Sequence, residues 1–232
     1  MNIYYKIQSL LRIPVPIFIK KYFKKYYGLN KLDKQIKSYL NFNNGFFVEL
    51  GAHDGITQSN TFYYEKNKNW NGILIEPTPH IFLKLKKNRS KKNFYFNRAC
   101  VSFKFKKNFI ELIYSGLKTF SPKFMINKRQ IEHTAHPELT INDKIFTYKV
   151  RAVTLNSILI KAKAPKIIDF LSLDTEGAEF EVLNGIDFKR FSFRYMLIET
   201  YYFSKLKKFF LKKNYKYIKK INHNDYLFKI IK

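Results

Sequence analysis

The sequence predicts an α/β domain built on a mostly parallel sheet, with an antiparallel hairpin at its C-terminal end. Short apolar runs rich in strand-forming residues alternate with segments of helical periodicity, as βαβ units require. The last two strand-like runs are separated only by the polar turn 223–225, and such a hairpin can only be antiparallel. With 232 residues and 46% hydrophobic residues, the chain suits one domain with a buried core.

The first half of the chain carries the clearest alternation. Continuous apolar runs are typical of parallel strands that are buried on both faces. Gly51 ends the first of these runs, and Pro77 ends the second. In chain order, we predict a helix over 33–40, a strand over 46–50, a helix over 57–66, a strand over 72–76, a helix over 79–88 and a strand over 94–96.

Residues 103–150 interrupt this alternation. They contain Gly116, Pro122 and Pro137 and show no clear period, so we interpret them as an insertion that covers a cleft, with a strand over 149–152 at its end. The alternation then resumes with a helix over 154–160, a strand over 167–173, a helix over 178–183, a strand over 195–199, a helix over 205–213 and strands over 215–221 and 226–231.

We predict that residues 1–30 form a basic and aromatic extension and that one domain spans residues 31–232. Such a segment either lies on an anionic membrane surface or packs on the domain as an arm or lid. No apolar span is long enough for a transmembrane helix, and the apolar stretch near the start lacks the features of a signal peptide. Cys100 is the only cysteine, so no intramolecular disulfide is possible. We therefore expect a cytoplasmic protein.

The net charge of +27 invites comparison with nucleic-acid-binding proteins. However, only seven of the 44 basic residues are arginine, the residue that makes bidentate contacts with phosphates and bases. The excess of lysine accompanies many Asn, Ile, Phe and Tyr residues, all of which have A/T-rich codons. We interpret the charge as a solvated lysine-rich surface and expect no specific nucleic-acid binding.

The first segment with chemical content joins the strand over 46–50 to the region that follows it. Here Glu49, Gly51, His53, Asp54 and Gly55 form a glycine turn that is flanked by acids. The G-x-G-x-x-G dinucleotide fingerprint is absent, and acids replace the glycines that would cradle a diphosphate. This pattern suits a ligand that carries an ammonium group. The alternative is an ordinary turn between a strand and a helix.

Glu76 is the second such feature, because it ends the second predicted strand. An acid at this position can accept hydrogen bonds from both ribose hydroxyls of an adenosine. Glu76 follows Gly51 by 25 positions (76 − 51), close to the roughly 20 of such a unit. The alternative is a surface glutamate before a proline turn.

Several acids follow the strand over 167–173, at the sheet edge where ligands bind in open α/β folds. Asp174, Glu176 and Glu179 lie there, and Glu199 ends the next strand. Such acids can serve as a general base, orient a substrate hydroxyl or bind a divalent cation. Helix capping is the alternative, and Glu179 fits it best.

Taken together, these motifs resemble the FkbM family of methyltransferases. The resemblance covers roughly residues 44–202 and rests on ordered segments: Phe47–Gly55, Ser59–Thr61, Trp70–Pro77, Asn97 with Ala99, Thr154–Leu155 and Asp174–Glu179. It implies a Rossmann-like methyltransferase fold with a seven-stranded sheet and S-adenosyl-L-methionine as methyl donor. It also implies methylation of a hydroxyl on a glycan or small metabolite.

The resemblance also assigns site residues. It places the donor against Glu49, Gly51, His53, Asp54, Gly55, Ser59, Asn60, Glu76, Pro77, Asn97 and Ala99, with Glu76 on the ribose and Asn97 and Ala99 near the adenine. It places Asp174 and Glu176 at the acceptor side, and we predict that these two acids and Glu199, which ends the next strand, are catalytic. His53 stands where the family more often has Asn, so its role stays open.

Two other functions compete with this hypothesis. An RNA cap or ribose methyltransferase would fit the charge, although the Asn/Asp-Pro-Pro-aromatic motif of amino-directed base methylation is absent at Asp174. Cys100 also lacks the proline that usually precedes a cytosine-methylating nucleophile. A non-catalytic Rossmann-like binding module is the second alternative. His133 and His136 are either ligands or a polar loop pair.

Overall fold

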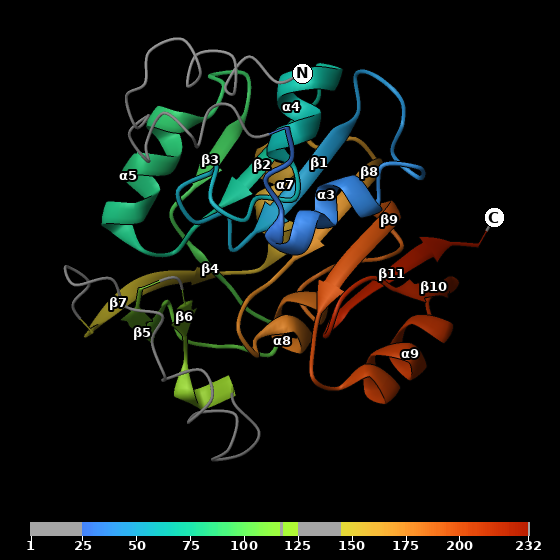
Figure 1. Ribbon diagram of the computed structural model, residues 1–232. Helices are drawn as coiled ribbons and strands as arrows, with labels where there is room; N and C mark the ends of the chain where they lie inside the picture. Colours follow the sequence, from blue (N-terminus) through green and yellow to red (C-terminus); the bar gives the residue numbers. More distant parts are fainter. Residues whose placement is uncertain (1–24, 117, 125–144, 232) are drawn as a thin grey trace, which may run out of the picture.

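A computed structural model describes residues 25–116, 118–124 and 145–231. The chain forms one large sheet with helices on both faces and a smaller second sheet beside it (Figure 1). The strands of the large sheet are β1 (Phe46–Leu50), β2 (Asn71–Ile75), β3 (Phe94–Phe96), β8 (Ile167–Leu173), β9 (Ser192–Glu199), β10 (Tyr215–Lys220) and β11 (Asp225–Ile230). The helices are α3 (Leu32–Gln35), α4 (Phe62–Lys68), α5 (Pro79–Asn88), α7 (Leu155–Lys161), α8 (Glu179–Leu183) and α9 (Phe203–Leu211), with short 3₁₀ turns at Leu29–Lys31 and Pro122–Phe124.

The large sheet has the strand order β10-β11-β9-β8-β1-β2-β3. All pairs from β9 to β3 are parallel, whereas β11 runs antiparallel to both β9 and β10. Thus β10 points in the same direction as the five parallel strands. The predicted seven-stranded, mostly parallel sheet with a C-terminal antiparallel hairpin is confirmed. Because the chain leaves β1 toward β2 on one side and later returns to β8 on the other, a crevice forms between these strand ends.

The core consists of two apolar layers, one on each face of the sheet. Successive strand residues point to opposite faces, so Val48 and Leu50 join the layer formed with α7, α8 and α9. Phe47 joins the other layer, formed with α4, α5 and the α3 region. This alternation on buried strands explains why both faces of the sheet need helical cover.

The second sheet arises largely from the segment that we interpreted as an insertion. Its order is β4-β7-β5-β6, with β4 (Ala99–Cys100), β5 (Phe109–Ser115), β6 (Lys118–Phe120) and β7 (Phe146–Val153). The expectation of no clear period was wrong for β5, because Ile110, Leu112 and Tyr114 are buried at every second position. His133 and His136 lie outside the described residues.

Two helices differ from their predicted bounds by more than two residues at one end. α4 begins at Phe62 instead of residue 57, because the side chains and amides of residues 59–61 bind Glu49 rather than continuing a helix. The predicted helix over 33–40 is shortened to α3. The first difference comes from tertiary contacts that override local helix propensity, whereas residues 36–40 continue after α3 as turns closed by hydrogen bonds between residues three apart.

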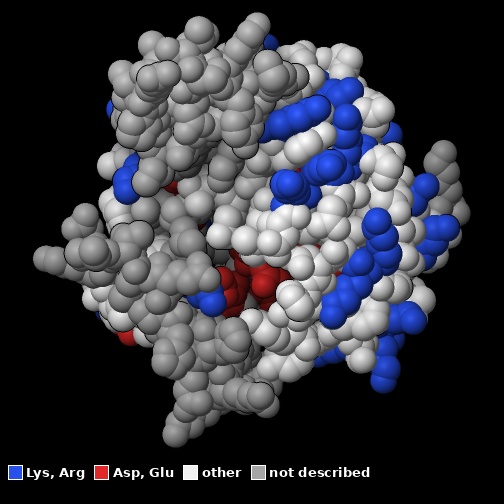
Figure 2. Space-filling model, in the orientation of Figure 1, with Lys and Arg blue, Asp and Glu red and all other residues white. Residues whose placement is uncertain are grey.

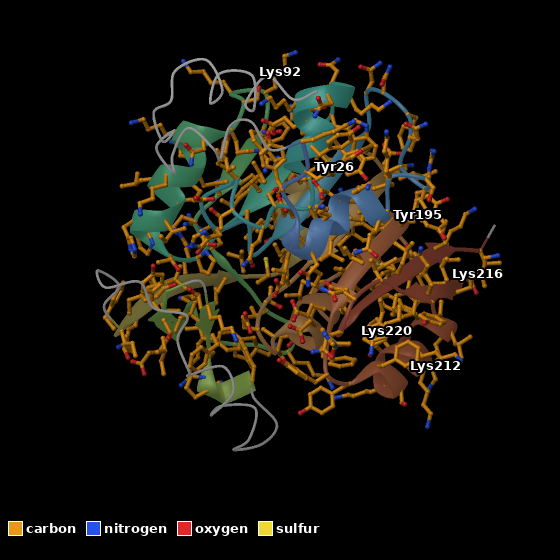
Figure 3. The ribbon with its side chains drawn as sticks, viewed as in Figure 1. Tyr26, Lys92, Tyr195, Lys212, Lys216 and Lys220 are labelled. Carbon is orange, nitrogen blue, oxygen red and sulfur yellow. The ribbon has the colours of Figure 1, made fainter. Side chains whose placement is uncertain are left out.

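Only the end of the predicted N-terminal extension is described. Tyr26 stacks on Tyr63 with ring centroids 4.9 Å apart, and Tyr27 meets Phe62 edge to face at 4.7 Å. Figure 3 labels Tyr26 beside α3 and α4. The basic residues of positions 1–24 lie outside the described residues, so their membrane or lid role stays a prediction. Within the described ranges, no helix is both long and apolar enough to cross a membrane.

β10 forms one edge of the large sheet and carries several lysines. Lys216 and Lys220 are exposed on this edge strand, with Lys212 nearby at the end of α9 (Figure 3). Lysines on an edge strand disfavour pairing with a second chain. Part of the high positive charge therefore has a structural explanation.

Candidate active site

A cleft opens at the carboxyl edge of the large sheet. The turn after β1 lines it with Gly51 and His53, the end of β2 with Glu76, and the end of β8 with Asp174 and Glu176. Figure 2 shows acidic side chains gathered in a hollow near the middle of this face. The position is the switch point between β1 and β8, where ligands bind in open α/β sheets.

The turn after β1 is packed directly on the end of β8. Gly51 has φ 72°, and a Cβ at this position would overlap the carbonyl oxygen of Asp174. The amide of Asp174 also donates to the carbonyl of Leu50 at 3.4 Å. Only glycine permits this close approach, which places residues from distant parts of the chain on one wall.

Glu76 is buried where β2 ends, at 4% exposure. Its Oε2 accepts the amide of His53 at 3.0 Å, and its Oε1 accepts the amide of Thr78 at 2.8 Å. Burial raises the pKa of this carboxyl group, while the two amides and the neighbouring histidine oppose that shift. The Thr78 side chain adds a further hydrogen bond to this carboxylate, which is held in place and still lines the cleft, where it can accept a hydrogen bond from a ligand.

The segment after Glu76 is tied to the end of β3. Asn97 donates from Nδ2 to the carbonyls of Glu76 and Pro77, at 2.9 and 2.8 Å. Pro77 and Ala99 line the cleft, but Asn97 is not among its lining residues. Asn97 therefore shapes the wall through the backbone on which Pro77 lies.

Glu49 lies behind the cleft wall, at 3% exposure, and is not a lining residue. Its carboxylate accepts the hydroxyls of Ser59 and Thr61 and the amide of Asn60, at 2.6 to 3.1 Å. It also forms an ion pair with Arg89, whose Nη1 lies 3.3 Å from Oε2. Ser59 and Asn60 thus meet Glu49 rather than the cleft.

Asp54 and Gly55 likewise build the turn from inside. Asp54 accepts the amides of Ile56 and Thr57 at 2.9 and 2.6 Å, and the Thr57 hydroxyl at 2.9 Å. Gly55 has φ 81° and does not line the cleft. His53 does line it, and its buried Nδ1 has no hydrogen-bond partner among the described residues. The nearest Asp54 oxygen lies 3.8 Å from that nitrogen.

On the opposite side of the cleft, acids face one another. Burial and the charge of Glu199 hold the pKa of Asp174 well above its usual range, and a hydrogen bond between the two carboxyl groups favours the protonated Asp174. Burial, then the charge of Asp225, raises the pKa of Glu199 to about 7. Asp225 pairs with Glu199 across β11 and β9, and burial raises its pKa to about 6. In the described ranges, no ion pair with a basic residue relieves Asp174 or Glu199.

The remaining acids of this edge have different environments. Glu176 lines the cleft from a left-handed turn, with φ 50°. Glu179 is buried, and its Oε1 accepts the amide of Gly177 at 2.8 Å and the hydroxyl of Thr175 at 3.2 Å, so it holds the turn before α8. In the part of the chain that the structure describes, no three acidic, histidine or cysteine side chains form a metal-binding group.

The segment that we interpreted as an insertion over a cleft supplies one wall of this cleft, but its lining residues were not predicted. Leu112, Thr119 and Phe120 line the cleft from β5 and β6, and Arg98 lines it just before β4. The Thr78 hydroxyl lies 3.0 Å from that of Thr119, which joins this wall to the start of α5. The alternation of apolar residues in β5 was a signal for a strand, but no local pattern identified which of its residues line the cleft.

Comparison with known families agrees with this geometry. The Methyltransferase FkbM domain matches residues 49–226, which is most of the chain and contains every strand from β2 to β9. The chain belongs to the FkbM methyltransferase family. It is therefore a methyltransferase, and the family resemblance of the sequence motifs is confirmed.

Other comparisons add little to this assignment. No curated protein matches the sequence. Among solved structures, this FkbM-family methyltransferase is similar to precorrin-6y C5,15-methyltransferase from Geobacter metallireducens GS-15, with 11% sequence identity and a TM-score of 0.42. That similarity covers 88% of this chain and 92% of the other.

Proposed function

We propose that the protein is an S-adenosyl-L-methionine-dependent O-methyltransferase that acts on a hydroxyl group of a glycan or small metabolite. The observation that carries this proposal is the composition of one cleft. The buried carboxylate of Glu76 lies on one side, and Asp174, which is hydrogen-bonded to Glu199 behind it, lies on the other.

The donor side suits an adenosine that carries an amino-acid tail. Glu76 can accept a hydrogen bond from a ribose hydroxyl, and Ile75, Ala99 and Phe120 supply apolar surface for an aromatic base. When bound, S-adenosyl-L-methionine supplies a methyl group on a sulfonium, a strong electrophile.

The acceptor side suits a hydroxyl, which is a poor nucleophile until it loses its proton. The chain has to hold this hydroxyl in the cleft and accept that proton. Glu199 has a pKa of about 7 and adjoins Asp174, so the pair carries a single shared proton near neutral pH. Asp174 is the cleft-lining member of the pair, so it receives the proton of the acceptor while the shared proton passes to Glu199, and the pair then holds two protons until one returns to solvent.

The test combines a binding and a transfer measurement. Calorimetry with S-adenosylhomocysteine is expected to show binding at micromolar concentration. Tritiated methyl donor, incubated with panels of glycans and small alcohols, is expected to label a hydroxyl oxygen. Label found only on amines would refute the O-methylation. Label found only on RNA ribose would favour a nucleic-acid methyltransferase instead. In that case the protein should still bind RNA at moderate salt concentration.

A further inference from the structure

We propose that Arg89 is a positioning residue, which together with Asn88 holds the turn over residues 50–55 in the shape that binds the donor. This inference rests on the proposed function, because it concerns the donor side of the same cleft. Neither residue lines the cleft. Their effect is exerted through the backbone and the carboxylate that they bind.

Arg89 directly follows α5 and is almost fully buried, at 4% exposure. Its guanidinium uses all three nitrogens. Nε donates to Glu65 at 2.8 Å, Nη1 to the carbonyl of Gly55 at 3.1 Å, and Nη2 to the hydroxyl of Thr61 at 2.9 Å. Nη1 also reaches the Glu49 carboxylate at 3.3 Å and the Ser59 hydroxyl at 3.2 Å. The Arg89 side chain therefore holds both the turn after β1 and the segment over 59–65 that follows it.

These contacts bracket the part of the chain that lines the cleft. Glu49 immediately precedes Leu50 and Gly51, while Gly55 comes two residues after His53. Asn88 adds a hydrogen bond from Nδ2 to the carbonyl of Asp54 at 2.8 Å. The end of α5 thus grips the turn on both sides of its cleft-lining residues. The same helix begins three residues after Glu76, so it connects both halves of the donor side.

Lysine cannot replace arginine in this role. A lysine ammonium is a single point charge, whereas these acceptors surround a planar group on several sides. The guanidinium also lies 5.3 Å from the Phe47 ring centroid and 5.2 Å from that of Phe62. A Cβ at Gly55 would overlap the Arg89 side chain, so residue 55 has to leave room for it. Only seven of the 44 basic residues are arginine, and Arg89 occupies a position where a planar guanidinium is required.

The test uses the full chain and compares Arg89→Lys with Asn88→Ala and a control, Arg194→Lys. Arg194 is exposed and pairs with Asp169, away from the cleft. We expect Arg89→Lys to weaken S-adenosylhomocysteine binding about tenfold or more, because charge-assisted hydrogen bonds to the turn are lost. Asn88→Ala should weaken it by a smaller factor, and the control should bind like wild type.

A merely structural role predicts a different pattern. It would lower the melting temperature of Arg89→Lys while leaving the affinity of the folded protein unchanged, and that result would overturn the proposal. With an acceptor in hand, the KM for the donor should rise while kcat at saturation changes little. Should Arg89→Lys fail to fold, wild-type affinity in Asn88→Ala would also refute it.

Failure of the proposed function gives a separate signal. If wild-type protein does not bind S-adenosylhomocysteine, the donor assignment falls, and amide hydrogen exchange decides the positioning role. Arg89→Lys should then speed exchange at residues 52–61 while the amides of β8 and β9 remain protected. A uniform rise across the chain would show that Arg89 stabilises the whole fold rather than this turn.

Discussion

Glu49 and Asp174 lie near the carboxyl ends of neighbouring parallel strands, yet their surroundings differ completely. Glu49 accepts hydrogen bonds from Ser59, Asn60 and Thr61 and an ion pair from Arg89. Asp174 instead faces another acid, and burial together with that charge raises its pKa.

The difference shows that acids at the same sheet edge can serve either a structural or a chemical role. An acid whose lone pairs are all occupied by protein donors anchors a loop and has nothing left for a ligand. An acid that lies beside other acids in a dry site holds a proton near neutral pH, which is the property of a general acid or base. Sequence patterns around the two residues are alike, so only their partners distinguish them.

The largest expected effect concerns Asp174. Asp174→Asn removes the proposed proton acceptor, so kcat should fall by roughly 10² to 10⁴ while the affinity for S-adenosylhomocysteine stays within a few-fold. Steady-state kinetics and calorimetry measure the two quantities. If this variant loses the donor while Glu176→Gln keeps full activity, the base assignment moves to Glu199 or a histidine. Activity that returns with added magnesium or manganese would indicate a metal site.

Glu49 should behave in the opposite way. Glu49→Ala leaves part of the Arg89 charge and three donors without their partner, so the free energy of unfolding should drop by about 3 kcal/mol. Urea denaturation measures it, and Glu111→Ala, at an exposed position of β5, is the control. A variant as stable as wild type would mean that water or Glu65 replaces the lost contacts, and the contrast with Asp174 would weaken.

Glu76 combines features of both environments, since it is buried and held by two amides but still lines the cleft. Glu76→Ala should weaken S-adenosylhomocysteine binding about tenfold or more while the protein stays folded, because each charge-assisted hydrogen bond is worth roughly 1.5–3 kcal/mol. Calorimetry decides the point, with circular dichroism as the check on folding. An unchanged dissociation constant would remove Glu76 from the ribose role.

The smallest expected effect concerns Glu199 and the way in which the free energy of unfolding changes with pH. Its pKa rises from 4.5 to about 7 on folding, so the folded state favours the protonated form. The stability that this proton contributes is fully present below about pH 4.5 and is lost as the pH rises to about 7. Glu199→Gln should therefore be more stable than wild type at about pH 8, by about 1–3 kcal/mol, and closer to it at about pH 5. Equal differences at both pH values would contradict the shifted pKa.

Local sequence patterns were sufficient to predict most of the large sheet. The strand over 167–173 and the helix over 79–88 match β8 and α5 in their bounds, because continuous apolar runs and amphipathic periods leave one stable arrangement. The acids at strand ends were also found, since parallel strands bring their carboxyl ends to one edge. The start of α4 was not predictable in this way. Residues 59–61 bind Glu49 instead of forming helix, and Glu49 is ten or more positions away, so no local pattern reveals the contact.

The family and the cleft-lining acids Glu76, Asp174 and Glu176 were accessible from sequence alone, because their motifs are short and follow directly from strand ends. Only the tertiary structure determined which carboxylates are fully hydrogen-bonded by protein donors and which can still interact with a ligand. Arg89 reaches Glu49 from 40 positions away, and the residues of β5 and β6 that line the cleft come from a segment in which we found no clear period. Burial, donor count and the proximity of other charges are properties of the folded environment, and they determine whether a carboxylate anchors a loop or exchanges a proton.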